Sequence, residues 1–192
     1  RRASYRRGDD GAADLAADLL KETIKLAGQL KGVSCKIAIS PSDQLDSVRK
    51  LLSTELTIIP QPKGDLGERL AQLFEASFSE GAGGVIVLGA DHPGLPLSYL
   101  EEAATALQGR KEQVVLGPTK DGGYYLVGLT EPAPKLFEEI PWSTSQVFEQ
   151  TLQRAEKLGL SVKQLPSWFD LDRPEDLKRY QSTRKEFKQS SG

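Results

Sequence analysis

The most constraining feature of the sequence is the run Val85 to Leu88, an uninterrupted apolar segment between a glycine-rich stretch and the motif GADHPGLP. A strand with one solvent-exposed face alternates apolar and polar residues, whereas an uninterrupted apolar run is typical of a strand covered on both faces. Helices cover both faces of the sheet in α/β proteins. We therefore expect Val85 to Leu88 to be the central strand of a sheet between two helical layers.

The rest of the chain alternates strand-like segments with segments of helical spacing. Apolar residues at three- and four-residue steps predict helices, and short apolar or alternating runs predict strands. The expected helices are 12–30, a short one from Ser42, 66–78, 98–107, 143–158 and 174–187, and the other expected strands are 33–39, 56–59, 114–116, 124–129 and 161–165. The short connections between these elements predict an α/β fold in three layers, α/β/α, with a mostly parallel sheet and right-handed crossovers.

Residues 1–10 differ in character from the rest of the chain. This segment, RRASYRRGDD, is rich in arginine, and the sequence contains no methionine. Such a start fits the end of a targeting peptide or a cloning remnant, so we expect 1–10 to be a disordered or processed segment. Residues 11–192 are expected to form a single domain of ordinary size that ends in a charged helix.

Charge and cysteine content exclude several classes of protein. The 25 basic residues are balanced by 27 acidic ones, which disfavours a nucleic-acid-binding protein, because such proteins need a basic face. Cys35 is the only cysteine, so no intrachain disulfide can form and a reducing compartment is favoured. No apolar run approaches the roughly 18 residues of a membrane helix. We expect a soluble, cytoplasmic protein, or an organellar one if the arginine-rich start ends a transit peptide.

Asp91 is the first candidate for chemistry, because ligands of α/β sheets bind beyond the carboxyl ends of the strands and Asp91 lies just after the apolar run. Mg²⁺ and Mn²⁺ prefer oxygen ligands and usually bind through one or two carboxylates together with substrate phosphates. The alternative is that Asp91 only caps the loop that follows. His92, the single histidine, is more often structural than catalytic beside such a turn.

The segment WFDLDRPEDL supplies two further carboxylates, Asp170 and Asp172. In an extended segment these side chains point to opposite faces, so at most one of them aims at a shared metal. The other could cap the helix that is expected to begin at Pro174, and the two roles could be exchanged. A DxD pair also occurs in phosphatases with an aspartyl nucleophile, but those enzymes place it after the first strand, so we set that interpretation aside.

Two glycine-containing loops are candidates for substrate contacts. In PKGDLGERL, Gly64 and Gly67 permit a close approach of the backbone to a ligand, and Lys63 and Arg69 could meet phosphate, although a plain helix-start turn explains the same residues. This loop matches neither the dinucleotide-binding GxGxxG pattern nor the P-loop.

In GPTKDGGYYLVGL, Gly122 and Gly123 indicate a tight backbone beside a ligand or a neighbouring strand, and Lys120 and Asp121 could bind substrate hydroxyls or phosphates. The later motif PWSTSQV is expected to start a helix, with Ser143 or Thr144 as its cap. Trp142 in this motif either packs in the core or lines an acceptor pocket.

Five segments, taken in order, resemble one family: PQPKGDLGERL, VIVLGADHPGLP, VVLGPTKDGGYYLVGL, IPWSTSQV and DLDRPEDL. They are similar to uncharacterised nucleotide-diphospho-sugar transferase-like proteins with the glycosyltransferase-A fold, of the type associated with radical-SAM and selenodomain proteins. The resemblance runs from about residue 11 to 177. Relatives by fold include molybdenum-cofactor guanylyltransferases, phospholactate guanylyltransferases and sugar nucleotidyltransferases.

The resemblance implies a metal-dependent transferase that moves a glycosyl or nucleotidyl group from a nucleotide sugar or nucleoside triphosphate to a small acceptor. Mg²⁺ or Mn²⁺ would be held by Asp91 and by Asp170 or Asp172, and would neutralise charge on the departing phosphate. Asp91 and Asp121 are the candidate catalytic residues. The implied nucleotide-binding residues are Lys63, Gly64, Asp65, Gly67 and Arg69, and the implied substrate-binding residues are Lys120, Gly122, Gly123, Trp142 and Ser143.

The start of the chain departs from the family pattern. Family members usually begin with a buried strand and a Lys-Thr-Arg-Leu loop that grips the nucleotide phosphates, and RRASYRRGDD stands in that place. We therefore expect the first strand of the fold to be absent from this chain. The alternative function is a non-catalytic nucleotide-binding or regulatory module that has lost this loop. A second copy of the chain could then cover the exposed centre of the sheet, which would make the protein a homo-oligomer.

Overall fold

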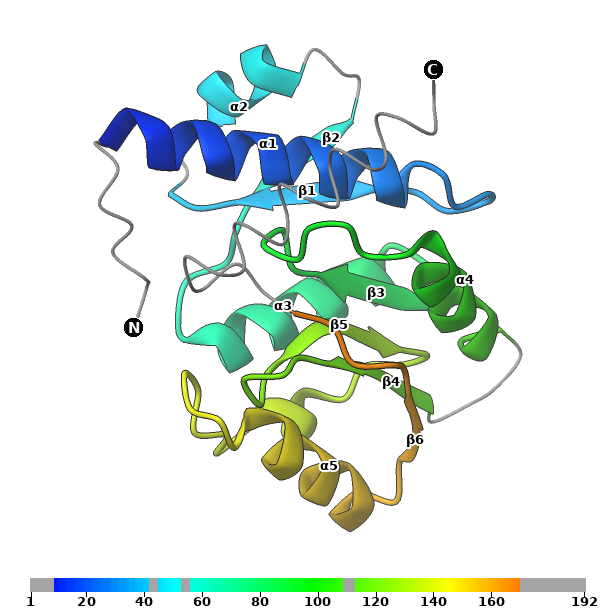
Figure 1. Ribbon diagram of the computed structural model, residues 1–192. Helices are drawn as coiled ribbons and strands as arrows, with labels where there is room; N and C mark the ends of the chain where they lie inside the picture. The colour runs from blue at the N-terminus through cyan, green and yellow to red at the C-terminus, as the bar shows by residue number, and fades with distance from the viewer. Residues whose placement is uncertain (1–8, 42–44, 53–55, 109–112, 170–192) are drawn as a thin grey trace.

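The computed structural model describes residues 9–41, 45–52, 56–108 and 113–169 of the chain (Figure 1). Helices and strands follow one another in the order that the sequence predicts, and a short 3-10 helix, η2, is added to them. The elements are α1 (Asp9–Ala27), β1 (Lys36–Ile39), α2 (Leu45–Leu52), β2 (Thr57–Pro60), α3 (Leu66–Ser79), β3 (Val85–Leu88), α4 (Leu97–Ala106), β4 (Gln113–Pro118), β5 (Tyr124–Leu129), η2 (Pro134–Phe137), α5 (Val147–Lys157) and β6 (Ser161–Gln164). The helix expected at 174–187 lies outside the described residues.

The strands form two sheets. β1 and β2 pair in parallel, and a second sheet has the order β3-β5-β4-β6. β5 runs antiparallel to both β3 and β4, while β4 and β6 are parallel, so β3, β4 and β6 point the same way. Only residues 119–123 join β4 to β5, and a connection that short makes a hairpin, since a parallel pair needs a crossover of a dozen or more residues. The predicted α/β class is confirmed, with β5 as the antiparallel exception in the larger sheet.

The expected central position of Val85 to Leu88 is wrong for the described residues. β3 is one of the two edge strands of its sheet, and all of its residues are partly exposed, whereas every residue of β4 is buried. An apolar run reports what covers the faces of a strand, but which strands pair at its edges depends on the connections of the whole chain. No described strand pairs with β3 on the side away from β5.

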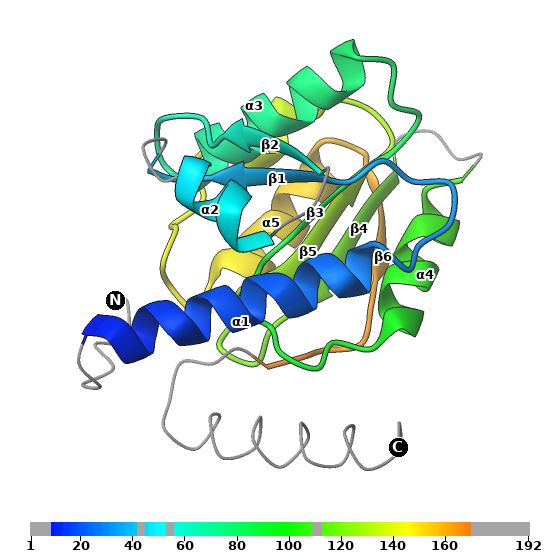
Figure 2. The ribbon, with the colours of Figure 1, turned by 90° about the horizontal axis from the view of Figure 1, so that it is seen from above.

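Helices cover both faces of the larger sheet. On one face α3, α5 and η2 pack against alternate residues of β4, Val114 and Leu116. On the other face Val115 packs with α4, and Leu26 and Leu30, near the end of α1, add to this cluster. Figure 2 shows α3 and α5 on one side of the strands and α1 and α4 on the other. The predicted three-layer arrangement is therefore confirmed.

Among the described residues, none of the helices is both long enough and apolar enough to cross a membrane.

Candidate active site

Several loops that carry candidate residues meet at one edge of the larger sheet. Because β3, β4 and β6 point the same way, the segments that follow them, 89–96, 119–123 and 165–169, begin at the same edge. Hydrogen bonds tie the last two segments together: the N–H of Lys120 donates to the carbonyl of Trp168 and the N–H of Trp168 donates to the carbonyl of Pro118. The expected gathering of these segments at one edge is therefore observed.

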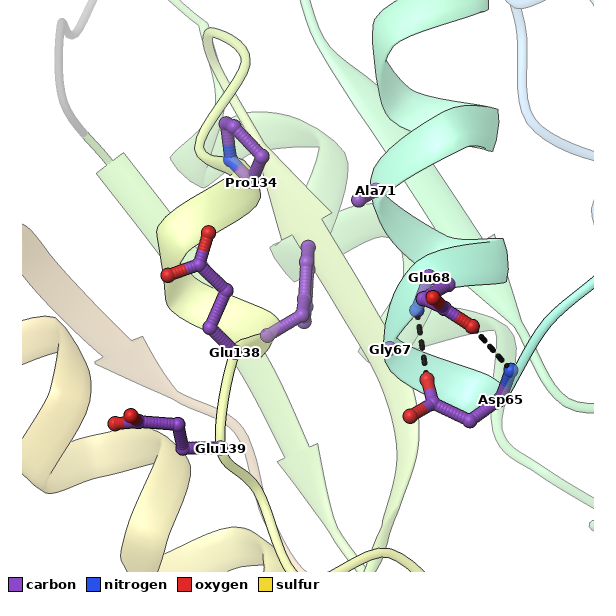
Figure 3. Close-up of a pocket in the computed structure, with 8 residues that line it drawn as sticks. Asp65, Gly67, Glu68, Ala71, Pro134, Glu138 and Glu139 are labelled. Atoms are coloured by element: carbon purple, nitrogen blue, oxygen red, sulfur yellow. Dashed lines mark hydrogen bonds between the residues drawn. The ribbon is translucent and has the colours of Figure 1, made fainter.

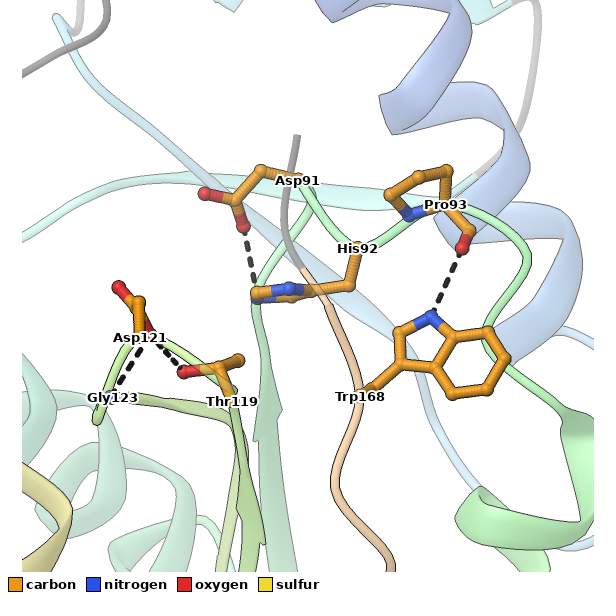
Figure 4. A network of polar contacts seen from close by, with 7 residues as sticks. All are labelled: Asp91, His92, Pro93, Thr119, Asp121, Gly123 and Trp168. Atoms are coloured by element: carbon orange, nitrogen blue, oxygen red, sulfur yellow. Dashed lines mark hydrogen bonds and ion pairs between the residues drawn. The ribbon is translucent and has the colours of Figure 1, made fainter. Parts of the chain in front are cut away.

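Asp91 and His92 form a close polar pair in the loop after β3 (Figure 4). The Nε2 atom of His92 lies 3.0 Å from Oδ1 of Asp91. The Asp91 side chain is 71% exposed, while that of His92 is only 7% exposed. Hydrogen bonding and charge from His92 hold the pKa of Asp91 below its usual range, although partial desolvation acts the other way. Asp91 is therefore an ionised carboxylate that a cation can reach from solvent.

Asp121 is also at this edge, in the hairpin between β4 and β5 (Figure 4). Its Oδ1 accepts hydrogen bonds from the hydroxyl of Thr119 and from the N–H of Gly123. This is the pattern of an Asx turn, in which a carboxylate stabilises the backbone two residues ahead. Asp121 is exposed, and in the described structure its contacts shape the hairpin. Thr119 is a polar contributor that the sequence patterns did not single out.

Trp168 joins the segment after β6 to the loop that carries Asp91. Its indole Nε1 donates a hydrogen bond of 3.0 Å to the carbonyl of Pro93, and its ring meets the ring of Tyr99 edge-on at 5.8 Å. Trp168 and Phe169 directly precede Asp170 in the sequence. The described chain thus reaches the edge where Asp91 lies and ends there at Phe169, while Asp170 and Asp172 lie outside the described residues.

The loop before α3 uses its polar groups to start the helix. Asp65 accepts a hydrogen bond from the N–H of Glu68, and the Glu68 carboxylate accepts one from the N–H of Asp65, which is a capping box. Arg69 donates from Nε to the carbonyl of Gly64 at 2.8 Å and from a guanidinium nitrogen to Gln61 at 3.3 Å. Within the described structure these groups bind one another.

Lys63 and Gly64 precede this capping box. Lys63 is exposed, and Gly64 has a φ of 111°, a conformation that favours glycine.

The loop 141–146, which precedes α5, contacts both the start of α3 and the hairpin between β4 and β5. A Cβ added to Gly67 would lie 2.8 Å from the Trp142 ring, and one added to Gly122 would lie 2.0 Å from the carbonyl oxygen of Ser145. The N–H of Phe148 also donates to the carbonyl of Gly122 at 2.8 Å. Gly67 and Gly122 are therefore sites of close approach, but their neighbours are other residues of this chain: Phe137 of η2 and Trp142 for Gly67, and Ser145 for Gly122.

The expected helix start at Ser143 is wrong. α5 begins at Val147, its N-cap is Gln146, and no side chain caps it. Ser143 is exposed with a φ of 65°, which a helix does not allow, and Thr144 donates to the carbonyl of Pro141 instead. The residues before α5 form turns, which leaves the Ser143 side chain free of a capping role.

A cavity of about 540 Å³ lies between the start of α3 and the segment around η2 (Figure 3). Its lining is Asp65, Gly67, Glu68, Ala71, Pro134, Phe137, Glu138 and Glu139. Four of these side chains are carboxylates, which repel phosphate in the absence of a cation. Glu139 is also paired with Arg154 at 2.6 Å. The chemistry of this cavity therefore does not suit a nucleotide phosphate.

The described residues contain no group of three or more His, Cys, Asp or Glu side chains that could hold a metal ion. A site for Mg²⁺ or Mn²⁺ needs only one or two carboxylates, because the substrate phosphates and water supply the remaining ligands. The ionised and exposed Asp91 fits one such position. His92 does not fit as a ligand, because its Nδ1 is buried and its Nε2 faces Asp91.

Solved structures of several nucleotide-dependent enzymes are similar to this fold. A candidate nucleotide-diphospho-sugar transferase from Desulfovibrio desulfuricans G20 is 28% identical, with a TM-score of 0.81 over 89% of this chain and 74% of that one. The CMP:2-keto-3-deoxy-manno-octonic acid synthetase, solved with CTP, is 11% identical, with a TM-score of 0.60 over 88% of each chain. The inositol-1-phosphate CTP transferase from T. maritima is 18% identical, with a TM-score of 0.51 over 85% of this chain and 80% of that one.

The comparison with curated proteins finds no match. The family model that matches covers residues 23–144, more than half of the chain, and describes an uncharacterized protein conserved in bacteria. This match and the neighbour from Desulfovibrio confirm the resemblance drawn from the five sequence motifs. The chain has a nucleotide-diphospho-sugar transferase-like fold and belongs to the DUF2064 family.

Proposed function

We propose that this chain is a metal-dependent transferase that moves a glycosyl or nucleotidyl group from a nucleotide sugar or a nucleoside triphosphate to a small acceptor. The observation that carries the proposal is Asp91: an ionised, exposed carboxylate at the carboxyl end of β3, on a fold shared with nucleotide-using transferases. Mg²⁺ or Mn²⁺ bound there would neutralise negative charge that develops on the departing phosphate.

The residues around Asp91 have distinct tasks in this proposal. Asp91 binds the cation together with Asp170 or Asp172, since the segment up to Phe169 reaches the same edge of the sheet. Lys120 lies exposed on the hairpin beside Trp168 and can bind phosphate. Asp121, Gly122 and Gly123 shape that hairpin, and the exposed Asp121 carboxylate can also accept a hydrogen bond from a substrate hydroxyl.

The loop before the N-terminus of α3 is the proposed nucleotide side, because it carries the exposed Lys63 and lies beside Arg69. Asp65 and Glu68 already occupy part of this terminus and add negative charge, so the phosphate contacts fall to Lys63 and to Arg69. Trp142 and Ser143 lie on the neighbouring loop, where the Trp142 ring reaches Gly67. They are the proposed acceptor contacts.

A non-catalytic nucleotide-binding module is the second candidate function. It is favoured by the hydrogen bonds that Asp65 and Arg69 make within their own loop, which leave fewer free donors for phosphate than an active phosphate grip would present. Such a module would bind nucleotide without a metal requirement and would turn over no substrate.

The substitution Asp91→Asn tests the proposal. We expect it to abolish metal-dependent nucleotide binding and to leave the melting temperature nearly unchanged, because the side chain is exposed. The measurement is the thermal shift with ATP, CTP, GTP, UTP, UDP-glucose and GDP-mannose, each with Mn²⁺ or with EDTA, since a bound ligand raises the melting temperature. Asp46→Asn, at an exposed position of α2, is the matched control.

Two results would contradict the proposal. One is a wild-type protein that gains no stability from any of these compounds with Mn²⁺. The other is an Asp91→Asn variant that binds as the wild type does. Binding that is equal with Mn²⁺ and with EDTA, and without turnover, would favour the module instead.

A further inference from the structure

His92 is almost wholly buried, yet its imidazole lies against an exposed carboxylate. The side chain is 7% exposed and its Nε2 atom is 3.0 Å from Oδ1 of Asp91. A carboxylate oxygen can only accept a hydrogen bond, so Nε2 must carry the proton in this contact. Asp91 is the exposed member of this pair, and the buried imidazole of His92 is the fixed member.

Three features fix the imidazole. The ring meets the ring of Tyr125 edge-on at 6.0 Å, and Tyr125 is itself 1% exposed. The Tyr125 hydroxyl donates to the carbonyl of Pro166 at 3.1 Å, which holds that ring in turn. The third feature is the space that Gly89 leaves beside the ring.

Gly89 provides the space in which the imidazole meets the carboxylate. A Cβ at this position would lie 2.6 Å from Nε2 of His92, 2.9 Å from its Cδ2 and 3.0 Å from Oδ1 of Asp91. Real Cβ atoms essentially never approach this closely, so any other residue at position 89 would displace the ring or the carboxylate. Gly89 does not have a positive φ, so its role is to leave space rather than to permit an unusual backbone.

We propose that His92 is a positioning residue that holds Asp91 in the orientation in which it binds the cation, and that Gly89 is a glycine because this contact needs the space. The inference rests on the proposed function of Asp91 as a metal ligand. His92 pairs with Oδ1 of Asp91, and because the Asp91 side chain is largely exposed, its other carboxylate oxygen is available to a cation. Partners that orient a metal ligand typically change the metal affinity by about 10- to 100-fold when they are removed.

The test compares His92→Phe with His92→Gln. Phenylalanine keeps a ring against Tyr125 and Gly89 but has no donor, whereas the glutamine amide can place an N–H close to the position of Nε2. The probe is the compound of the thermal-shift panel that stabilises the wild type most, titrated by calorimetry with Mn²⁺ and with EDTA. We expect the Mn²⁺-dependent affinity to fall about tenfold or more in His92→Phe and to recover in His92→Gln.

A second variant, Gly89→Ala, tests the same contact between His92 and Asp91. We expect it to lower the Mn²⁺-dependent affinity as His92→Phe does. Gly83→Ala, where an added Cβ meets no atom within 4 Å, should bind as the wild type does. In all of these variants the affinity measured in EDTA should equal that of the wild type. If His92 served only to stabilise the fold, its loss would lower the affinity in EDTA as well.

The inference is overturned if His92→Phe keeps the Mn²⁺-dependent affinity of the wild type, or if it loses binding equally with Mn²⁺ and with EDTA. The proposed function fails in a different way, with no Mn²⁺-dependent binding by the wild type itself. That result would remove the positioning role as well.

Discussion

Gly117 shows how a single absent side chain shapes the interior of this protein. It is a buried residue of β4, and a Cβ added to it would lie 2.3 Å from Cζ of Tyr125, on the neighbouring strand. The aromatic ring therefore occupies the volume that a side chain at position 117 would take. The ring of Tyr125 also packs edge-on against the imidazole of His92.

We expect Gly117→Ala to destabilise the fold by about 1 to 3 kcal/mol, because the added methyl group overpacks a buried contact that cannot relax into solvent. Chemical denaturation at equilibrium measures this free energy of unfolding. Gly83→Ala is the control, since it places the same methyl group in open space. Equal stability of the two variants would contradict the packing that we describe for Tyr125.

At this scale the sequence predicts which residue types are suited to a task but not which contacts they make. Asp91 was recognisable from its place after an apolar run. Its contact with His92 was not, because the contact depends on the turn after β3, on Gly89 and on the Tyr125 ring from another strand. The glycine two residues before Asp91 was the available signal.

α3 is the element whose start carries both a structural and a proposed binding role. The capping box of Asp65 and Glu68 satisfies N–H groups that the first turn of a helix leaves without partners. The same turn lines the acidic cavity and touches Trp142 through Gly67. A variant at this helix end can therefore change both stability and ligand binding, so both must be measured for each variant.

We expect Asp65→Ala to lower the free energy of unfolding by about 1 kcal/mol, the usual effect of losing an N-cap, and Asp65→Asn to keep most of it. Denaturation curves of both variants give the stability, and the nucleotide panel gives the binding. If the cap is the only role of Asp65, the asparagine variant binds as the wild type does. A stability of Asp65→Ala equal to that of the wild type would contradict the capping role.

Elements with a clear local signal were predicted well. The bounds of α3, β3 and β5 agree with the expected 66–78, 85–88 and 124–129 to within one residue. α5 begins later than expected because the turns at 143–146 use Ser143 in a left-handed conformation, which helical spacing does not report. The short helix η2 has no apolar period that would identify it.

The arrangement of the whole molecule was only partly predictable. Three layers follow from the alternation of helices and strands, but the edge position of β3 follows from the order β3-β5-β4-β6, which no single segment encodes. The candidate site likewise depends on the arrangement of the whole chain. Its parts come from the loops after β2, β3, β4 and β6 and from the segment before α5, and they meet only when all of these are in place.

The contacts between these loops form a continuous series. Gly67 of α3 touches Trp142, Ser145 of the same loop touches Gly122, Thr119 of that hairpin pairs with Trp168, and Trp168 bonds to Pro93 beside His92. The two tryptophans of the chain therefore lie in this series on different loops, Trp142 next to the start of α3 and Trp168 next to the loop that carries Asp91.

This placement makes the intrinsic fluorescence of the protein informative. In Trp142→Phe the remaining emission comes from Trp168, and we expect Mn²⁺ with nucleotide to change it, because the proposed cation ligand Asp91 is on the neighbouring loop. In Trp168→Phe the emission of Trp142 should respond to the nucleotide or the acceptor. Binding that calorimetry detects but that changes neither signal would place the ligand elsewhere. The chain thus carries one optical reporter for each side of its candidate site, and no external label is needed to observe them separately.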